Sequence, residues 1–169
     1  MAIAPTDELR REIASLLPRL RRFGRTLTRH REDADDLVQT AVERALQRLD
    51  QWQPGTRVDS WMFRIMQNAW IDELRARERR GRSLVPEDEA EPVEGVLPDQ
   101  QAESLALRRA LAQLGDDHRA VVGLVLVEGL PYKEAADVLG IPIGTLTSRL
   151  ARAREHLQSL LSPPREGSS

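Results

Sequence analysis

The stretch from 130 to 161 constrains the fold more than any other part of this chain. It reads LPYKEAADVLGIPIGTLTSRLARAREHLQSLL, two helical patterns separated by a glycine and a proline. Pro131 suits the first turn of a helix, and Gly140 is a natural stop for that helix. A second helix is expected after Pro142. A short helix that ends at a glycine and is followed at once by a longer helix is the layout of a helix-turn-helix.

The longer helix has one apolar stripe and one polar face. Apolar residues recur at spacings of four, three and four, so this side can pack on the rest of a domain. The stripe consists of Leu146, Leu150, Ala153 and Leu157. At about 100° per residue, the outward positions are Thr145, Ser148, Ala151 and Arg152, with Arg149 and Arg154 on the flanks. Arginine can donate two hydrogen bonds to a guanine edge or one to a phosphate. A solvated amphipathic helix is the alternative, but the short helix before it favours binding to duplex DNA.

The net charge of −2 conceals a strong segregation of charge. Residues 1–82 hold 17 arginines and 13 acidic residues, 83–103 hold seven acids and no base, and 104–169 hold eight basic and seven acidic residues. The acidic middle has three prolines and one glycine, which is typical of a flexible linker. We therefore expect two helical domains, 1–82 and 104–169, joined by the acidic linker 83–103. Its composition is compatible with domains that are packed together or apart.

Composition also narrows the class of protein. The chain has 169 residues and no cysteine, which excludes disulfides and thiolate metal sites. No apolar run approaches the roughly 20 residues needed to span a bilayer, and no signal-peptide pattern opens the chain, so we expect a cytoplasmic protein without membrane insertion. His30, His118 and His156 are scattered, and neither a phosphate-binding glycine loop nor a nucleophile motif is present. We expect no enzyme, no cofactor and no metal site.

The N-terminal half shows three helical segments and no strand pattern, so the predicted fold class is all-α. The first covers about 6–28, with Pro18 interrupting or restarting it. The second covers about 32–50, and its predicted core stripe is Leu37, Ala41, Ala45 and Leu49, with Val38, Val42 and Leu46 beside it. Its first turn carries Asp33, Asp35 and Asp36, which either favour the helix dipole or bind a partner. The third begins near Asp59 or Ser60, either of which could cap it.

Aromatic and basic side chains are interleaved around the third segment. Trp52, Trp61, Phe63 and Trp70 lie within nineteen residues, and five arginines follow, at positions 75, 77, 79, 80 and 82. Such a mixture can bind single-stranded nucleic acid by stacking on bases and neutralising phosphates. The alternative is that the aromatic side chains fill a small core. The Pro-Gly loop at 51–58, QWQPGTRV, could present polar atoms to an extruded base.

Three motifs in this order resemble the extracytoplasmic-function (ECF) group of bacterial sigma factors. They are DADDLVQTAVERAL, QPGTRVDSWMFRIMQNAWIDELR and LPYKEAADVLGIPIGTLTSRLARARE. The likeness covers nearly the whole chain outside the linker and the extreme ends. The chain is also similar to the branch of this group that serves the alphaproteobacterial general stress response. The resemblance implies a sigma-two-like helical bundle in 1–82 and a sigma-four-like helix-turn-helix domain in 104–169.

The resemblance also implies roles for individual residues. Those implied to bind core polymerase, at the clamp coiled coil of its largest subunit, are Asp36, Leu37, Gln39 and Thr40. Those implied to meet the minus-ten element are Trp52, Gln53, Thr56, Trp61, Phe63, Asn68, Asp72 and Arg75, with Met62 beside the melting duplex. Those implied to meet the minus-thirty-five element are Thr145, Thr147, Ser148, Arg149 and Arg152. The acidic linker would cross the polymerase cleft toward the RNA exit path.

The function implied is promoter choice and strand opening for RNA polymerase core enzyme, at genes of a stress response. The implied partners are core enzyme, promoter DNA and an anti-sigma protein, with no small-molecule substrate. Two positions depart from the pattern: relatives commonly have Lys or Arg where Thr147 stands, and often Ser where Pro131 stands. The alternatives are a stand-alone helix-turn-helix regulator, in which 1–82 serves as a ligand or dimer domain, and an all-α adaptor that binds only protein.

Overall fold

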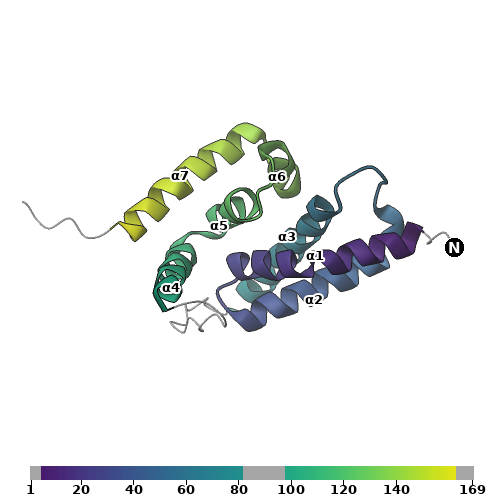
Figure 1. Cartoon of the computed structure of the whole chain (residues 1–169), viewed down its shortest axis with the longest axis horizontal. Helices are drawn as coiled ribbons and strands as arrows, with labels where there is room; N and C mark the ends of the chain where they lie inside the picture. The colour runs from purple at the N-terminus through teal and green to yellow at the C-terminus, as the bar shows by residue number, and fades with distance from the viewer. Residues whose placement is uncertain (1–4, 82–97, 163–169) are drawn as a thin grey trace, which may run out of the picture.

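The computed structural model describes residues 5–81 and 98–162, and in these ranges all regular structure is helical (Figure 1). The N-terminal half contains α1 (Pro5–Leu27), α2 (Arg31–Gln47), the 3-10 turn η1 (Leu49–Gln51) and α3 (Val58–Arg79). The C-terminal half contains α4 (Pro98–Gln113), α5 (Asp116–Val122), the π-helical turn η2 (Gly123–Val127), α6 (Tyr132–Leu139) and α7 (Ile143–Leu161). The predicted all-α class is confirmed.

Two features of the helices differ from those expected from the sequence. α4 begins at Pro98, inside the segment predicted as linker, and the rest of that segment lies outside the described residues. Pro18 was expected to interrupt α1, but the helix runs through it. A proline at this position removes the hydrogen bond to the carbonyl of Ala14. Both residues are exposed, so water can satisfy that carbonyl. None of the helices in the described ranges is long and apolar enough to cross a membrane.

The helix-turn-helix forms as predicted. α6 ends at Gly140, whose φ of 64° and ψ of 34° are left-handed, and the amide of Ile141 then donates to the carbonyl of Ala136 at 3.1 Å. Glycine adopts this conformation without steric cost, which explains why the helix stops there. α7 starts directly after Pro142. Its predicted apolar stripe is buried along the whole helix, with exposed fractions of 0% to 8% for Leu146, Leu150, Ala153 and Leu157.

The N-terminal helices α1, α2 and α3 pack against one another around a core that extends into the C-terminal half. Leu37, Ala41 and Ala45 of the predicted α2 stripe are buried, whereas Leu46 at its edge is 45% exposed. The same hydrophobic cluster continues through Leu124 of the C-terminal half. A second, smaller cluster joins α4, α5 and α7 through Ala110, Val122 and Leu157, among others.

The two halves are packed together rather than separated. α1 contacts α5 and η2, and α3 contacts α6, as Figure 1 shows in the region between the two groups of helices. Arg119 of α5 donates from Nε to the carbonyl of Leu27 in α1, at 3.3 Å. Gly123 lies against Phe23 and Thr26 of α1 so closely that a Cβ there would be 3.0 Å from the phenylalanine ring. The absence of a side chain at Gly123 permits this close approach.

We expect Gly123→Ala to lower the free energy of unfolding by about 1 kcal/mol, because an added methyl group overpacks a close contact by about 1–3 kcal/mol and regains part of that in helix propensity. The Phe23 ring cannot easily move, since it is fully buried against Phe63. Gly144→Ala is the matched control: Gly144 is also helical, and beyond its chain neighbours and the backbone of its own helix no atom lies within 4 Å of the added Cβ. Urea unfolding followed by circular dichroism should show that the free energy of unfolding falls in Gly123→Ala and rises in Gly144→Ala. Equal stabilisation by both would contradict the packing argument.

Candidate nucleic-acid interface

α7 presents the outward face that the sequence predicted. Thr147, Ser148 and Arg152 are exposed, and Thr145 and Arg149 are half-buried. The hydroxyl of Thr147 donates to the carbonyl of Gly144 at 2.9 Å, so this side chain is partly engaged with its own helix. Nη1 of Arg149 lies 3.9 Å from a carboxylate oxygen of Asp117. Ser148 and Arg152 therefore offer the most accessible polar groups of the predicted minus-thirty-five set.

The loop between η1 and α3 is a turn whose shape its sequence dictates. Gly55 has a φ of 88°, and the amide of Thr56 donates to the carbonyl of Gln53 at 3.2 Å, which closes a turn around Pro54 and Gly55. Proline followed by glycine is the residue pair that a type II turn favours. The hydroxyl of Thr56 also donates to the carbonyl of Gln53, at 2.6 Å. Gln53 and Thr56 are both exposed at this turn.

The aromatic residues divide into core and surface. Phe63 and Trp70 are buried, with exposed fractions of 0% and 4%, which confirms the core alternative for these two. Phe63 packs edge-on against Phe23, with ring centroids 5.0 Å apart. Trp52 and Trp61 are half-buried and pack against the main core cluster. In this conformation Trp52 and Trp61 have surface to offer a base, and Phe63 has none.

Further along α3, three exposed residues of the predicted minus-ten set share one face. Asn68, Asp72 and Arg75 follow one another at helical spacings of four and three. The carboxylate of Asp72 accepts a hydrogen bond from Nη1 of Arg44 on α2, at 3.1 Å. Asp72 therefore holds the guanidinium of Arg44, from α2, beside this face of α3. Sequence reasoning missed Arg44 because the pairing depends on how α2 and α3 pack.

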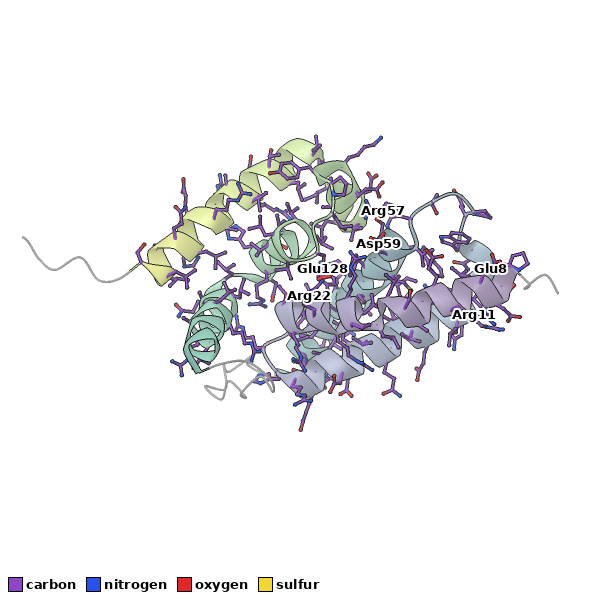
Figure 2. All side chains as sticks on the ribbon, viewed as in Figure 1. Glu8, Arg11, Arg22, Arg57, Asp59 and Glu128 are labelled. Carbon is purple, nitrogen blue, oxygen red and sulfur yellow. The ribbon has the colours of Figure 1, made fainter. Side chains whose placement is uncertain are left out.

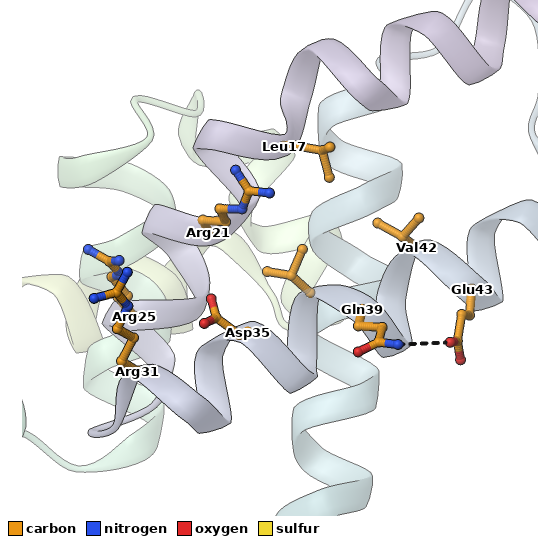
Figure 3. Close-up of a pocket in the computed structure, with 9 residues that line it drawn as sticks. Leu17, Arg21, Arg25, Arg31, Asp35, Gln39, Val42 and Glu43 are labelled. Atoms are coloured by element: carbon orange, nitrogen blue, oxygen red, sulfur yellow. Dashed lines mark hydrogen bonds between the residues drawn. The ribbon is translucent and has the colours of Figure 1, made fainter.

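The predicted polymerase-binding residues lie on α2, next to an open groove between α1 and α2 (Figure 3). The groove combines the apolar side chains of Leu17, Val38 and Val42 with the charged side chains of Arg21, Arg25, Arg31, Asp35 and Glu43. Gln39 also lines it and donates to Glu43 at 3.5 Å. Asp36 is exposed and Thr40 half-buried, whereas Leu37 is 5% exposed and belongs to the core.

Asp33 has a structural role at the start of α2. Arg77 of α3 donates to both of its carboxylate oxygens, at 2.7 and 3.1 Å, and also to Glu73 at 2.9 Å. The guanidinium of Arg77 lies over the ring of Trp70, 5.3 Å from its centroid. The hydrogen bond to Asp33 raises the pKa of Arg77, against the opposing effect of burial. Of the three first-turn aspartates, Asp35 and Asp36 are left at the surface.

Asp59 is held by three donors at the first turn of α3. It accepts hydrogen bonds from Arg57 at 2.8 and 3.1 Å, from Arg19 at 3.1 Å and from the amide of Ser60 at 2.7 Å. Burial on its own would raise the pKa of the carboxyl, but these bonds outweigh it and hold the pKa of Asp59 below its ordinary value. Neither Asp59 nor Ser60 is the helix cap that the sequence suggested, because the helix begins earlier, at Val58.

Two family models match the chain, one in each half. The model described as the Sigma2 domain of PhyR matches residues 13–67, and the model described as Sigma-70, region 4 matches residues 104–157. The ECF RNA polymerase sigma factor EcfG of Rhodopseudomonas palustris is 36% identical, over 92% of this chain and 86% of its own length. SigW of Bacillus subtilis, another ECF sigma factor, is 30% identical, over 76% of this chain and 75% of its own.

Solved structures agree with the sequence relatives. The sigma factor RpoE of Bartonella quintana, solved in complex with the anti-sigma factor NepR, superposes with a TM-score of 0.82 at 30% identity, over 94% of this chain and 99% of that one. CnrH, solved with the cytosolic domain of CnrY, superposes with a TM-score of 0.68 at 26% identity, over 94% of this chain and 90% of that one. The chain belongs to the ECF family of RNA polymerase sigma factors.

We expect Arg77→Ala to lower the free energy of unfolding by about 1.5–3 kcal/mol, because it leaves the half-buried Asp33 without its charged donor. Arg79→Ala is the matched control, since Arg79 is an exposed arginine on the last turn of the same helix, and its loss should change stability by no more than about 0.5 kcal/mol. Thermal and urea unfolding measure both. Similar losses for the two variants would assign the effect to net charge rather than to the Asp33 contact.

Proposed function

We propose that this sigma factor contacts promoter DNA through two separate surfaces. The outward face of α7 reads the minus-thirty-five element, and the loop between η1 and α3 together with the exposed face of α3 reads the minus-ten element. The observation that carries the proposal is the division of α7 into a fully buried stripe and an opposite face with exposed Ser148 and Arg152. Most of the affinity comes from phosphate contacts, and a few base contacts worth about 1–3 kcal/mol each give specificity.

The groove between α1 and α2 is the proposed site for core polymerase. An apolar strip lined by both arginine and carboxylate side chains fits an amphipathic helix of mixed charge. A coiled coil of the polymerase clamp offers helices of this kind. Gln39, Asp36 and Thr40 lie on the adjoining surface of α2, and Leu37 supports it from the core. The polymerase supplies the catalysis, and this chain supplies promoter choice and strand opening without being an enzyme itself.

An anti-sigma protein is the further partner that we propose. Support comes from the structural relatives, which were solved with the anti-sigma factor NepR or with CnrY. Cytoplasmic localisation and a role in the general stress response are also part of the proposal. Affinity capture from unstressed cells should recover a partner in addition to polymerase. Recovery of polymerase alone would count against an anti-sigma partner.

The direct test mixes the purified protein with RNA polymerase core enzyme on a genomic promoter library. Selective transcripts that are absent with core enzyme alone would support the proposal and would reveal both promoter elements. If no core complex forms and the protein alone footprints duplex DNA, a stand-alone helix-turn-helix regulator becomes the better assignment.

We expect Arg152→Ala to reduce transcription about tenfold, because the variant loses one contact worth about 1–3 kcal/mol. The loss should be confined to promoters that carry the upstream element. Arg109→Ala, which removes an exposed arginine from α4, is the matched control and should leave transcription unchanged. Run-off transcription from promoter pairs with and without the upstream element measures the effect. Equal activity of Arg152→Ala and the parent on both promoters would contradict the assignment of α7.

A further inference from the structure

Asp59 connects the turn that precedes α3 to helix α1. Its side chain is 10% exposed, and Figure 2 shows it beside Arg57 at the start of α3. Arg57 donates from Nε to one carboxylate oxygen at 3.1 Å and from Nη2 to the other at 2.8 Å. Arg19 of α1 donates to the second oxygen at 3.1 Å, and the amide of Ser60 donates to the first at 2.7 Å. Each oxygen of Asp59 therefore accepts two hydrogen bonds.

Arg19, the donor from α1, is itself held in place. Its guanidinium carbon lies 5.3 Å from the centroid of the Phe63 ring, which is fully buried. Its Nε lies 3.4 Å from a carboxylate oxygen of Glu128, a side chain that is 0% exposed. Glu128 in turn accepts two hydrogen bonds of 2.7 Å from Arg22. Because Arg19 has these fixed neighbours, its bond to Asp59 keeps that carboxylate in one orientation.

The bonds to Arg57 fix one end of the turn that we propose reads the minus-ten element. Arg57 is the last residue before α3, and its backbone is extended, with a φ of −74° and a ψ of 124°. A bidentate pair restricts both the position and the orientation of the guanidinium. At the other end of the turn, Trp52 packs against the main core cluster. Residues 53–56 are therefore held on both sides, with Gln53 and Thr56 exposed between them.

The turn also has hydrogen bonds of its own, but they do not fix its direction relative to α3. Both the amide and the hydroxyl of Thr56 donate to the carbonyl of Gln53. These bonds close the turn internally, whereas the pairing of Arg57 with Asp59 connects it to the helix. A segment that is ordered before binding avoids the cost of ordering when its ligand arrives. A polar group discriminates between bases only when it is held in place, so the connection bears on base selection.

Direct contact between Arg57 and a DNA phosphate is the alternative role for this side chain, which is 44% exposed. Its Nε and Nη2 are already engaged by Asp59. The hydrogen bonds to Asp59 raise the pKa of Arg57 most, burial opposes them, and the charges of Asp59 and Glu134 raise it further. A phosphate at this guanidinium would therefore approach two carboxylates, which disfavours it. The arrangement suits an anchor better than a contact with DNA.

We infer that Asp59 is a positioning residue: through Arg57 it holds residues 53–56 in the orientation that selects the minus-ten sequence. Asp59 acts on the turn and makes no contact with DNA itself. The orientation of the turn is a property of this chain alone, and the effect on base selection rests on the proposed function.

Backbone relaxation tests the positioning without any partner. The ¹⁵N order parameters of Gly55 and Thr56 report the motion of the turn. We expect about 0.8 in the parent and about 0.6 or less in Asp59→Asn, which keeps the shape of the side chain but removes its charge and one acceptor oxygen. Glu78→Gln is the matched control, because it removes one negative charge at an exposed residue near the other end of α3. It should leave both order parameters at the parental value.

A second variant guards against a general loss of structure in the first. Arg57→Lys keeps the positive charge but cannot form the bidentate pair. It should loosen the turn to the same extent as Asp59→Asn. The double variant should loosen it no further, since both changes break one contact. Unchanged order parameters in both single variants would overturn the positioning role.

Transcription tests the effect on selection. Core enzyme with each variant is assayed on a promoter library in which the minus-ten element is randomised and the minus-thirty-five element is constant. For Asp59→Asn and Arg57→Lys, the ratio of transcription from preferred over mismatched minus-ten sequences should fall about tenfold, whereas Glu78→Gln should keep the parental ratio. A role in stability alone would lower transcription from all promoters equally and leave the ratio unchanged. Lysine can still neutralise a phosphate, so a direct phosphate contact would leave Arg57→Lys with parental selectivity.

Each outcome decides one part of the inference. A looser turn with an unchanged ratio, or parental selectivity in Arg57→Lys alone, would overturn the role of Asp59 in base selection. If no version transcribes selectively, the parent included, the proposed function fails and the role in selection fails with it. The order parameters still decide in that case whether Asp59 holds the turn.

Discussion

The carboxylate of Glu128 is the constraint on which the arrangement of the two halves depends. A charge removed from water must be paired, and within residues 5–81 and 98–162 the pairing comes from Arg22 and Arg19 of α1. Apolar contact alone would tolerate sliding of one half on the other. The bidentate hydrogen bonds from Arg22 and the close approach of Gly123 to Phe23 do not tolerate such sliding. Together they place α6 across α3, and from this follows which functional surfaces are open and which are covered.

The packing of the two halves affects the proposed binding surfaces unequally. The outward face of α7, the turn at 53–56 and the groove between α1 and α2 remain accessible. The first two turns of α3 are only partly open, because Ser60 and Arg64 donate hydrogen bonds to α6. The groove proposed for core polymerase therefore stays open while the two halves are packed together.

Local sequence rules predicted the elements well where side-chain periodicity and turn chemistry agree. The stripe on α7, the stop at Gly140 and the all-α class were confirmed. The interruption at Pro18 was wrong, because an exposed carbonyl tolerates the missing hydrogen bond. The choice between core and base stacking could not be made from the sequence. Burial resolved it for Phe63 and Trp70, since aromatic residues next to arginines occur both in small cores and in nucleic-acid sites.

By itself, the sequence determined the helices, the separation of charge along the chain and the helix-turn-helix, because these depend on interactions within a few residues. Only the tertiary structure decided that Asp33 binds Arg77, that Asp72 holds Arg44 and that Glu128 lies sealed against Arg22. The last of these pairs joins residues 106 positions apart. An acidic residue after an apolar run has no local pattern that distinguishes a solvated carboxylate from a buried one. The difference arises only when α1 covers it, and that depends on the packing of the whole molecule.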